Sequence, residues 1–269
     1  MPNTYRYCYG VGDVTPKLNI YEIHQIKTLS EYVRTAVIDL HHIEKNLHMG
    51  STLSCIEILT VLVSKYIRRS SDKLNRDWLI LSKGHAAPAL YVLLAEVGII
   101  PREELVKIQS INSILQGHPD ISIPGVDMST GSLGQGLSFA VGIATWIKFK
   151  GGYGRVYVIM GDGEQDEGQV WEAMTDAVRR GLDNLLVIID VNDYQLDGKT
   201  SEVKPKHYMP LIWKTVGWEV FVCDGHDIIS LINSIDNALS CGRPSVIFAK
   251  TVRGRGLKPI EGTELQRVE

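Results

Sequence analysis

The sequence is poor in cysteine, and the few cysteines it has are scattered. Its 269 residues include four cysteines, Cys8, Cys55, Cys223 and Cys241, none of which belongs to a CxxC pair. A zinc site built from cysteines needs such close pairs, and a disulfide framework is unusual in a chain of this length with so few thiols. We therefore expect reduced, mostly buried thiols, as in a protein of the cytoplasm.

Long hydrophobic runs are also missing. The longest apolar segments, residues 90–95 and 185–189, are far shorter than the roughly 20 residues that a membrane-spanning helix needs. The first residues have no apolar core of the kind that marks a secretory signal. The sequence therefore predicts a cytoplasmic protein without a membrane partner.

A surplus of positive charge is absent as well. The chain carries 28 Lys and Arg against 31 Asp and Glu, a formal net charge of −3, whereas dedicated nucleic-acid binders are normally basic. Hydrophobic residues make up 44% of the sequence, which is enough to bury a core and excludes a disordered chain. No repeat or linker divides the sequence. We expect no nucleic-acid partner, an N-terminal arm over residues 1–28 and one domain over residues 29–269.

Continuous apolar segments alternate with helical patterns in the second half of the chain. The apolar segments lie at 156–160, 185–189, 219–222 and 246–249, and helical patterns fall at 170–178 and 228–239. Strands that are apolar on both faces and separated by helices are typical of a parallel sheet that is covered on both sides. The sequence therefore predicts a doubly wound α/β domain with helices on both faces, whose first helix starts at Ser30.

Small residues follow the string GSLGQG at residues 131–136, among them Ala140, Gly142 and Ala144. Glycine lowers the stability of a helix, so it is usually found there for a packing reason. We expect another part of the chain to pack very close to this backbone.

Polar side chains follow two of the predicted strands, at the edge of the sheet where ligands bind. Asp162 lies between Gly161 and Gly163 after one strand, and Asn192 follows the next strand 30 residues later. A carboxylate, an amide oxygen and the main-chain carbonyl of Tyr194 are oxygen ligands that suit Mg²⁺, with a diphosphate and water completing the shell. Either string alone is a common turn; the pair after consecutive strands predicts a magnesium site.

At these residues the sequence resembles the transketolase family, which uses thiamine diphosphate and Mg²⁺. The string GDGEQDEGQVWEA at 161–173, followed by Asn192, carries the resemblance. Three further strings are similar to transketolase strings and occur in the same order, LSKGHAAPALY at 81–91, GHPD at 117–120 and PGVDMSTGSLGQG at 124–136. The similarity extends from about residue 30 to about residue 257 and implies a thiamine diphosphate-binding fold.

The resemblance also implies roles for individual residues. The metal ligands would be Asp162, Asn192 and the carbonyl of Tyr194. The residues that contact the cofactor would be Asp162, Asn192, Gly163, His85, Gly131, Leu133 and Lys250. His48, His85 and His118 would act at the reacting centre and on the sugar substrate, and Glu167 would join a carboxylate network at a subunit interface.

The similarity covers only the first of the three domains of a single-chain transketolase. We therefore expect the N-terminal, diphosphate-binding subunit of a split enzyme that transfers a two-carbon ketol unit from a ketose to an aldose. Its partner would carry the aminopyrimidine-binding and C-terminal domains, in an α2β2 heterotetramer, and this chain would be inactive alone.

Two departures from the family pattern keep other interpretations open. No histidine follows Gly256, where the family usually has one that helps to bind diphosphate and substrate, and the neighbours of His48 differ from the family string. The alternatives are a thiamine enzyme subunit that uses a 2-oxo acid donor or an unusual sugar acceptor, and a non-catalytic protein that has kept the fold. A nucleotide enzyme lacks support, because no GxxxxGK[ST] string is present.

Overall fold

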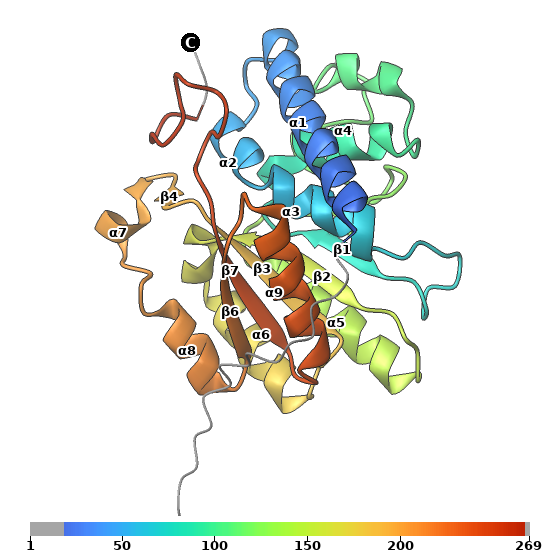
Figure 1. The fold of residues 1–269 in the computed structure, drawn as a ribbon, viewed down its shortest axis with the longest axis vertical. Coiled ribbons are helices and arrows are strands. Elements are labelled where there is room, and N and C mark those ends of the chain that lie inside the picture. Colours follow the sequence, from blue (N-terminus) through green and yellow to red (C-terminus); the bar gives the residue numbers. More distant parts are fainter. Residues whose placement is uncertain (1–18, 267–269) are drawn as a thin grey trace, which may run out of the picture.

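A five-stranded parallel sheet forms the centre of the molecule (Figure 1). The computed structural model describes residues 19–266. In the order in which they lie in the sheet, the strands are β1 (Trp78–Leu81), β2 (Val156–Gly161), β3 (Leu185–Val191), β7 (Ser245–Lys250) and β6 (Glu219–Asp224). Every neighbouring pair is parallel. This topology confirms the predicted doubly wound α/β fold.

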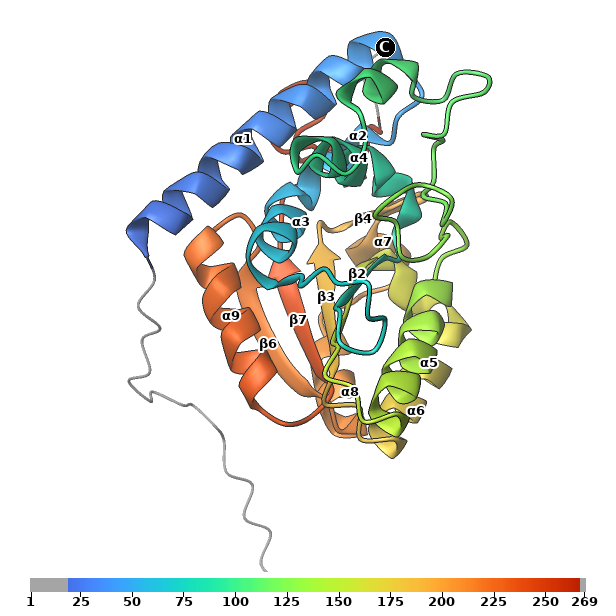
Figure 2. The same cartoon turned by 90° about the vertical axis from the view of Figure 1, so that its right-hand side faces the viewer.

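Helices cover both faces of the sheet, as Figure 2 shows. One face is covered by α1 (Ile20–Ile43), α2 (Met49–Ser54), α3 (Ile56–Val61), α4 (Ala87–Glu96) and α9 (Ile228–Ser240). The other face is covered by α5 (Gln135–Phe149), α6 (Gly168–Arg179) and α8 (Met209–Val216). A hairpin of β4 (Tyr194–Gln195) and β5 (Gly198–Lys199) and the short α7 (Thr200–Val203) follow β3. Short 3-10 or π helices occur at 62–66, 84–86, 102–107 and 163–166.

Two hydrophobic cores lie on opposite sides of the sheet, and the strands contribute alternate residues to each. In β3, Leu186 and Ile188 pack with α1, α3 and α9, whereas Val187 and Ile189 pack with α5 and α6. Each of these side chains is 2% exposed or less. Both faces of the strand are buried, which explains why its sequence is continuously apolar rather than alternating.

The first helix begins ten residues before the predicted start at Ser30. Asn19 caps α1, because its side-chain oxygen accepts a hydrogen bond from the Tyr21 N–H (3.0 Å). Residues 20–28 are therefore helix and not arm; the rest of the predicted arm, residues 1–18, lies outside the described residues. The apolar periodicity is weak here because Ile26 is the only residue of the first two turns that is buried.

The two glycines of α5 differ in what lies beside them. A Cβ at Gly136 would stand 2.2 Å from Ser82 Oγ and 2.8 Å from Ser82 Cα, so the helix backbone packs directly on the end of β1. This contact confirms the expected close approach at Gly136. The expectation is wrong for Gly142, which is exposed and where a Cβ would have nothing within 4 Å.

Within residues 19–266 no helix combines the length and the apolar character that crossing a bilayer would require.

Because Gly136 packs directly against Ser82, replacing Gly136 by Ala should destabilise the domain. The methyl group has to displace Ser82, directly after β1, and overpacking of this kind costs about 1–3 kcal/mol. In the matched variant Gly142→Ala the methyl group enters open space and removes a glycine from a helix, so we expect a gain of about 0.5–1 kcal/mol. Urea denaturation of both variants tests the expectation, and equal effects in the two would contradict it.

Candidate active site

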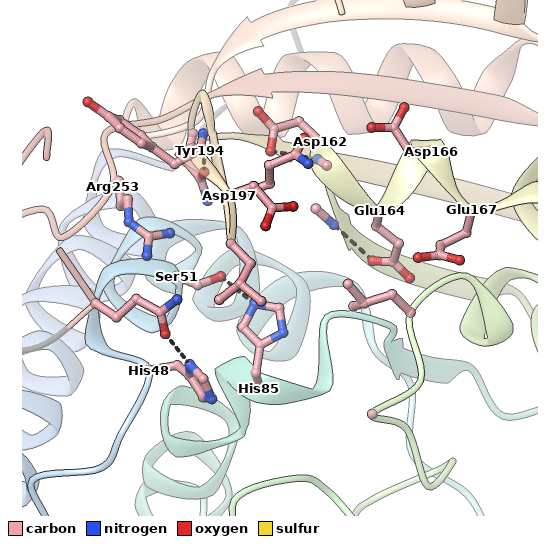
Figure 3. Close-up of a pocket in the computed structure, with 18 of the residues that line it drawn as sticks. His48, Ser51, His85, Asp162, Glu164, Asp166, Glu167, Tyr194, Asp197 and Arg253 are labelled. Atoms are coloured by element: carbon pink, nitrogen blue, oxygen red, sulfur yellow. Dashed lines mark hydrogen bonds between the residues drawn. The ribbon is translucent and has the colours of Figure 1, made fainter. Parts of the chain in front are cut away.

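A pocket of ≈ 400 Å³ lies beyond the carboxyl ends of β2 and β3 (Figure 3). This is the edge at which parallel α/β sheets bind ligands. Residues that are far apart in the sequence meet there. Of the predicted site residues, those that line it are His48, His85, His118, Gly131, Leu133, Asp162, Gly163, Glu167, Asn192 and Tyr194.

Asp162 lies against the turn that follows β3. Its Oδ1 accepts a hydrogen bond from the Gly163 N–H (2.9 Å), and its Oδ2 accepts one from the Asp193 N–H (2.9 Å). In the same turn Asn192 Oδ1 accepts a hydrogen bond from the Tyr194 N–H (3.1 Å). The neighbouring strands β2 and β3 end at the same level, so the three residues that were predicted to hold a metal come together.

The Asp162 carboxyl is buried with no Lys or Arg in an ion pair with it among residues 19–266. The residue is 2% exposed, and burial, together with the nearby Asp190, raises its pKa to about 7. A bound cation would stabilise such a carboxylate. The donor set contains one carboxylate, one amide and one main-chain carbonyl, all of them oxygens, which fits Mg²⁺. The described residues contain no cluster of three or more His, Cys, Asp or Glu that could hold a metal, as expected for a set with a single carboxylate.

A buried ion pair between Lys83 and Asp190 lies behind this turn. The two side chains are 1% and 0% exposed. Burial alone would lower the pKa of Lys83, but the Asp190 carboxylate raises it overall; burial likewise would raise the pKa of Asp190, but Lys83 and hydrogen bonds lower it. Both groups are therefore charged in the folded chain. The Lys83 ammonium also donates to the Ser51 carbonyl (2.9 Å).

Asp190 fixes the orientation of Asn192. One carboxylate oxygen, Oδ2, accepts hydrogen bonds from Ser54 Oγ (2.5 Å) and from Asn192 Nδ2 (3.2 Å). The other oxygen accepts the Thr251 hydroxyl. Since the amide nitrogen of Asn192 is held by Asp190, its amide oxygen faces the turn of residues 192–195 after β3, which we name the metal turn because it carries the predicted ligands. The pair Lys83 and Asp190 was not predicted, because its partners come from four separate segments.

The three histidines of the pocket lie on different elements. His85 Nε2 is 2.8 Å from Ser51 Oγ, and its ring is edge-on to His48 with 5.5 Å between the centroids. Burial, Lys83 and the neighbouring histidines hold the pKa of His85 well below its usual 6.5. Burial and His48 also lower the pKa of His118. His85 and His118 are therefore neutral near pH 7, and each has one ring nitrogen that can accept a hydrogen bond.

Arg253 is a cation of the pocket that was not predicted from the sequence. It is 6% exposed, and its Nε has no hydrogen-bond partner. Burial lowers the pKa of the guanidinium. No described residue forms an ion pair with it, and a Cβ at Gly50 would stand 2.7 Å from its Nε. A buried guanidinium that forms no ion pair, with Asp190 and Asp162 as the nearest charges acting on it, is open to the pocket and fits an anionic ligand.

Lys250 does not lie at the predicted place. It is exposed and lines a separate hollow with Asp224 and Asp227 instead of the pocket. The resemblance implied that Lys250 contacts the cofactor, but β7 ends at this residue and the chain then turns. The turn brings Arg253 to the pocket, three residues later.

Glu164 and Glu167 have different environments although both belong to the same motif. Glu164 is 2% exposed and accepts hydrogen bonds from the Gly134 N–H (2.8 Å), the Gly161 N–H (3.0 Å) and the Ser82 hydroxyl. It therefore joins the ends of β1 and β2 to the start of α5. Glu167 is exposed at the rim of the pocket, and its predicted place at a subunit interface stays a prediction.

The chain is similar to proteins of one known family over almost its whole length. Residues 25–266 match the family described as "Transketolase, thiamine diphosphate binding domain". The chain is 39% identical over 247 residues to a subunit of the apulose-4-phosphate transketolase of Phocaeicola vulgatus, which covers 88% of this chain and 87% of that protein. It is 39% identical over 220 residues to the 6-deoxy-6-sulfo-D-fructose transketolase subunit SqwG of Clostridium sp., covering 80% of each.

Single-chain transketolases match over a smaller part of their length. Human transketolase is 40% identical over 225 residues, which is 81% of this chain and 35% of that protein. The crystal structure of transketolase from Campylobacter jejuni superposes with a TM-score of 0.86 at 29% identity and covers 93% of this chain. This chain spans about 40% of the length of that solved transketolase.

The ion pair generates a stability prediction. Asp190→Asn leaves the buried Lys83 ammonium without its counter-charge, so we expect the free energy of unfolding to fall by about 3–5 kcal/mol. Adding Lys83→Met removes the second charge and should recover most of this loss. As a control, Asp183→Asn breaks an exposed pair with Lys148 and should cost less than about 1 kcal/mol. Urea denaturation measures all three, and a double variant no more stable than Asp190→Asn alone would contradict the expectation.

The environment of His85 generates a pH prediction. Its pKa in the folded chain lies below the ordinary 6.5, so the stability contributed by its neutral ring is present above pH 6.5 and is lost as the pH falls through the folded pKa. The ¹⁵N chemical shifts of the His85 ring should therefore remain those of a neutral imidazole from pH 8 down to pH 6.5. A ring that is already half protonated at pH 6.5 would show that burial and Lys83 do not control it.

Proposed function

The chain belongs to the transketolase family as its thiamine diphosphate-binding part, and we propose that it is the N-terminal subunit of a two-subunit transketolase. In this proposal it transfers a two-carbon ketol unit from a ketose to an aldose together with a second subunit. The relatives named as subunits of apulose-4-phosphate transketolase and of 6-deoxy-6-sulfo-D-fructose transketolase support a role of this kind.

The observation that carries the proposal is the buried Asp162 held against the turn of Asn192 and Tyr194, in a pocket that also contains three histidines. We assign Mg²⁺ to the Asp162 carboxylate, the Asn192 amide oxygen and the Tyr194 carbonyl. A carboxylate that burial alone would leave protonated near neutral pH gains most from such a cation.

The diphosphate would lie between the metal and Arg253. Gly163 lines the same pocket and would contact the diphosphate; a Cβ at Gly163 would stand 2.8 Å from Gln195 Cβ, so a larger residue does not fit there. Ser51 and His85, which are hydrogen-bonded to each other, line the same part of the pocket. Arg253 takes the role that the sequence had suggested for Lys250. Gly131 and Leu133 would contact the organic rings of the cofactor.

The histidines would act on the sugar. Bound thiamine diphosphate supplies the carbanion that accepts and releases the two-carbon unit. His85 and His118 are neutral at pH 7, so each can accept a hydrogen bond from a substrate hydroxyl or donate one to a carbonyl oxygen without burying a charge. A pocket with several neutral donor–acceptor groups suits a polyhydroxylated substrate better than a 2-oxo acid.

A partner subunit would cover the exposed side of the pocket. Phe139, Trp146 and Phe149 project from α5 at helical spacing and are 37%, 39% and 82% exposed. Leu133 at the rim is 36% exposed, and Glu167 is exposed beside it. We assign this apolar surface, defined by Leu133, Phe139, Trp146 and Phe149, to a partner that carries the aminopyrimidine-binding and C-terminal domains. An α2β2 assembly and a cytoplasmic location remain predictions from the sequence.

Reconstitution tests the proposed function. The tagged chain is purified from its native host with the polypeptide bound to it, and the two chains are then expressed together. We expect ketol transfer from a ketose phosphate to an aldose phosphate that needs both chains, Mg²⁺ and thiamine diphosphate. Pyruvate serves as the alternative donor: turnover of pyruvate without ketol transfer would establish the 2-oxo acid alternative, and binding of cofactor with neither activity would establish a non-catalytic protein.

Asp162→Asn tests the metal site within the same assembly. Mutating a residue that only hydrogen-bonds a metal ligand already lowers metal affinity by about 10- to 100-fold. Removing the charge of the ligand Asp162 itself should therefore weaken Mg²⁺ binding by more than about 100-fold, as measured by calorimetric titration. The matched control is Asp224→Asn at the end of β6, which is exposed and lies outside the pocket. Equal Mg²⁺ affinity in the two variants would remove Asp162 from the metal site.

A further inference from the structure

The segment after β7 returns to the pocket and contacts the start of α2. This segment, residues 251–266, lies beside α2 in Figure 1. Gln266 Oε1 is 2.9 Å from His48 Nδ1, as the dashed line in Figure 3 shows. The main-chain carbonyl of Gln266 also accepts a hydrogen bond from the Gly50 N–H (3.3 Å). Gln266 therefore contacts this end of α2 through both its side chain and its backbone.

Further hydrogen bonds fix the path of the segment. The Gly254 N–H donates to the Gly50 carbonyl (2.8 Å), and the Gly262 N–H donates to the Arg253 carbonyl (2.8 Å). The Tyr194 hydroxyl donates to the Gly262 carbonyl (2.8 Å). The segment is thus joined to α2 on one side and to the metal turn on the other, which places Gln266 reproducibly beside His48.

The chemistry of the contact determines which nitrogen of His48 carries the proton. An amide oxygen can only accept a hydrogen bond, so His48 Nδ1 must donate it. In the neutral ring Nε2 is then unprotonated and acts as an acceptor. No other hydrogen bond to the His48 ring is found among residues 19–266, and the ring lies edge-on to His85 within the pocket. Nε2 is available to a ligand.

We propose that Gln266 is a positioning residue that holds His48 in the Nδ1-protonated tautomer, so that His48 Nε2 accepts a hydrogen bond from a substrate hydroxyl. The proposal rests on the proposed function for the identity of that substrate, a sugar. It also explains the residue type: a carboxylate at 266 would favour a doubly protonated ring, which can only donate. With the neutral amide of Gln266, His48 Nε2 remains a hydrogen-bond acceptor in the pocket. It can bind a hydroxyl group, which donates a hydrogen bond, but not a carbonyl or phosphate oxygen, which only accepts one.

Nitrogen NMR of the full chain tests the tautomer without any need for activity. The chain is labelled with ¹⁵N-histidine, and the His48 signals are identified by their loss in His48→Asn. We expect long-range ¹H–¹⁵N correlations of a neutral ring protonated at Nδ1. Gln266→Ala should move the ring toward the Nε2-protonated form, and Gln266→Glu should give two protonated nitrogens. The control Gln116→Ala, an exposed glutamine outside the pocket, should change nothing.

Two results would overturn the proposal: an Nε2-protonated His48 in the wild-type chain, or an unchanged tautomer in Gln266→Ala. In the reconstituted enzyme Gln266→Ala should raise the KM for the ketose about fivefold to tenfold, as loss of one neutral hydrogen bond would, with a smaller change in kcat. An Nδ1-protonated His48 in a complex that transfers no ketol unit would sink the proposed function and leave the Gln266 contact intact, whereas ketol transfer with the wrong tautomer would do the opposite.

Discussion

The ion pair of Lys83 and Asp190 organises the whole pocket. Two opposite charges with 1% and 0% exposure are stable only when each is matched by the other and by hydrogen bonds. Those hydrogen bonds involve Ser51 and Ser54 of α2, Asn192 in the turn after β3 and Thr251 in the turn after β7. Three segments around the pocket are therefore hydrogen-bonded to the same ion pair. The side-chain amide of Asn192, a proposed metal ligand, takes its orientation from Asp190.

Around this centre the pocket combines three kinds of groups. A buried carboxylate, Asp162, lies on the side of the metal turn, and a buried guanidinium, Arg253, lies on the side of α2. His85 and His118, whose lowered pKa values keep them neutral near pH 7, line the same pocket. A cation beside the carboxylate and an anion beside the guanidinium complement each other, which suits a metal diphosphate. The apolar surface on α5 begins at the rim of the same pocket, so a partner that covers it also excludes water from the site.

The sequence was sufficient for those features that depend on local patterns. Continuous apolar segments predicted the parallel sheet because both faces of β3 are buried, and Asp162 and Asn192 could be paired because consecutive strands lie side by side. Features that depend on distant contacts could not be predicted. The resemblance implied Lys250 near the cofactor, and Arg253 was missed because the turn after β7 leaves no signal in the sequence. The start of α1 was missed because its first turns bury almost nothing, and Glu164 could not be distinguished from Glu167 without the backbone N–H groups that surround it.

The contact between His48 and Gln266 spans 218 positions of the chain, and this has a consequence for folding. Contacts of such sequence separation form late, because the entropy of closing a long loop must be overcome first. The sheet and most of the two cores can assemble before the segment 251–266 reaches α2, and Ile260 of this segment then completes the core beside α1, α3 and α9. During synthesis the pocket therefore lacks Arg253 and Gln266 until the domain has been made as far as these residues, so the pocket is completed after all five strands have been synthesised.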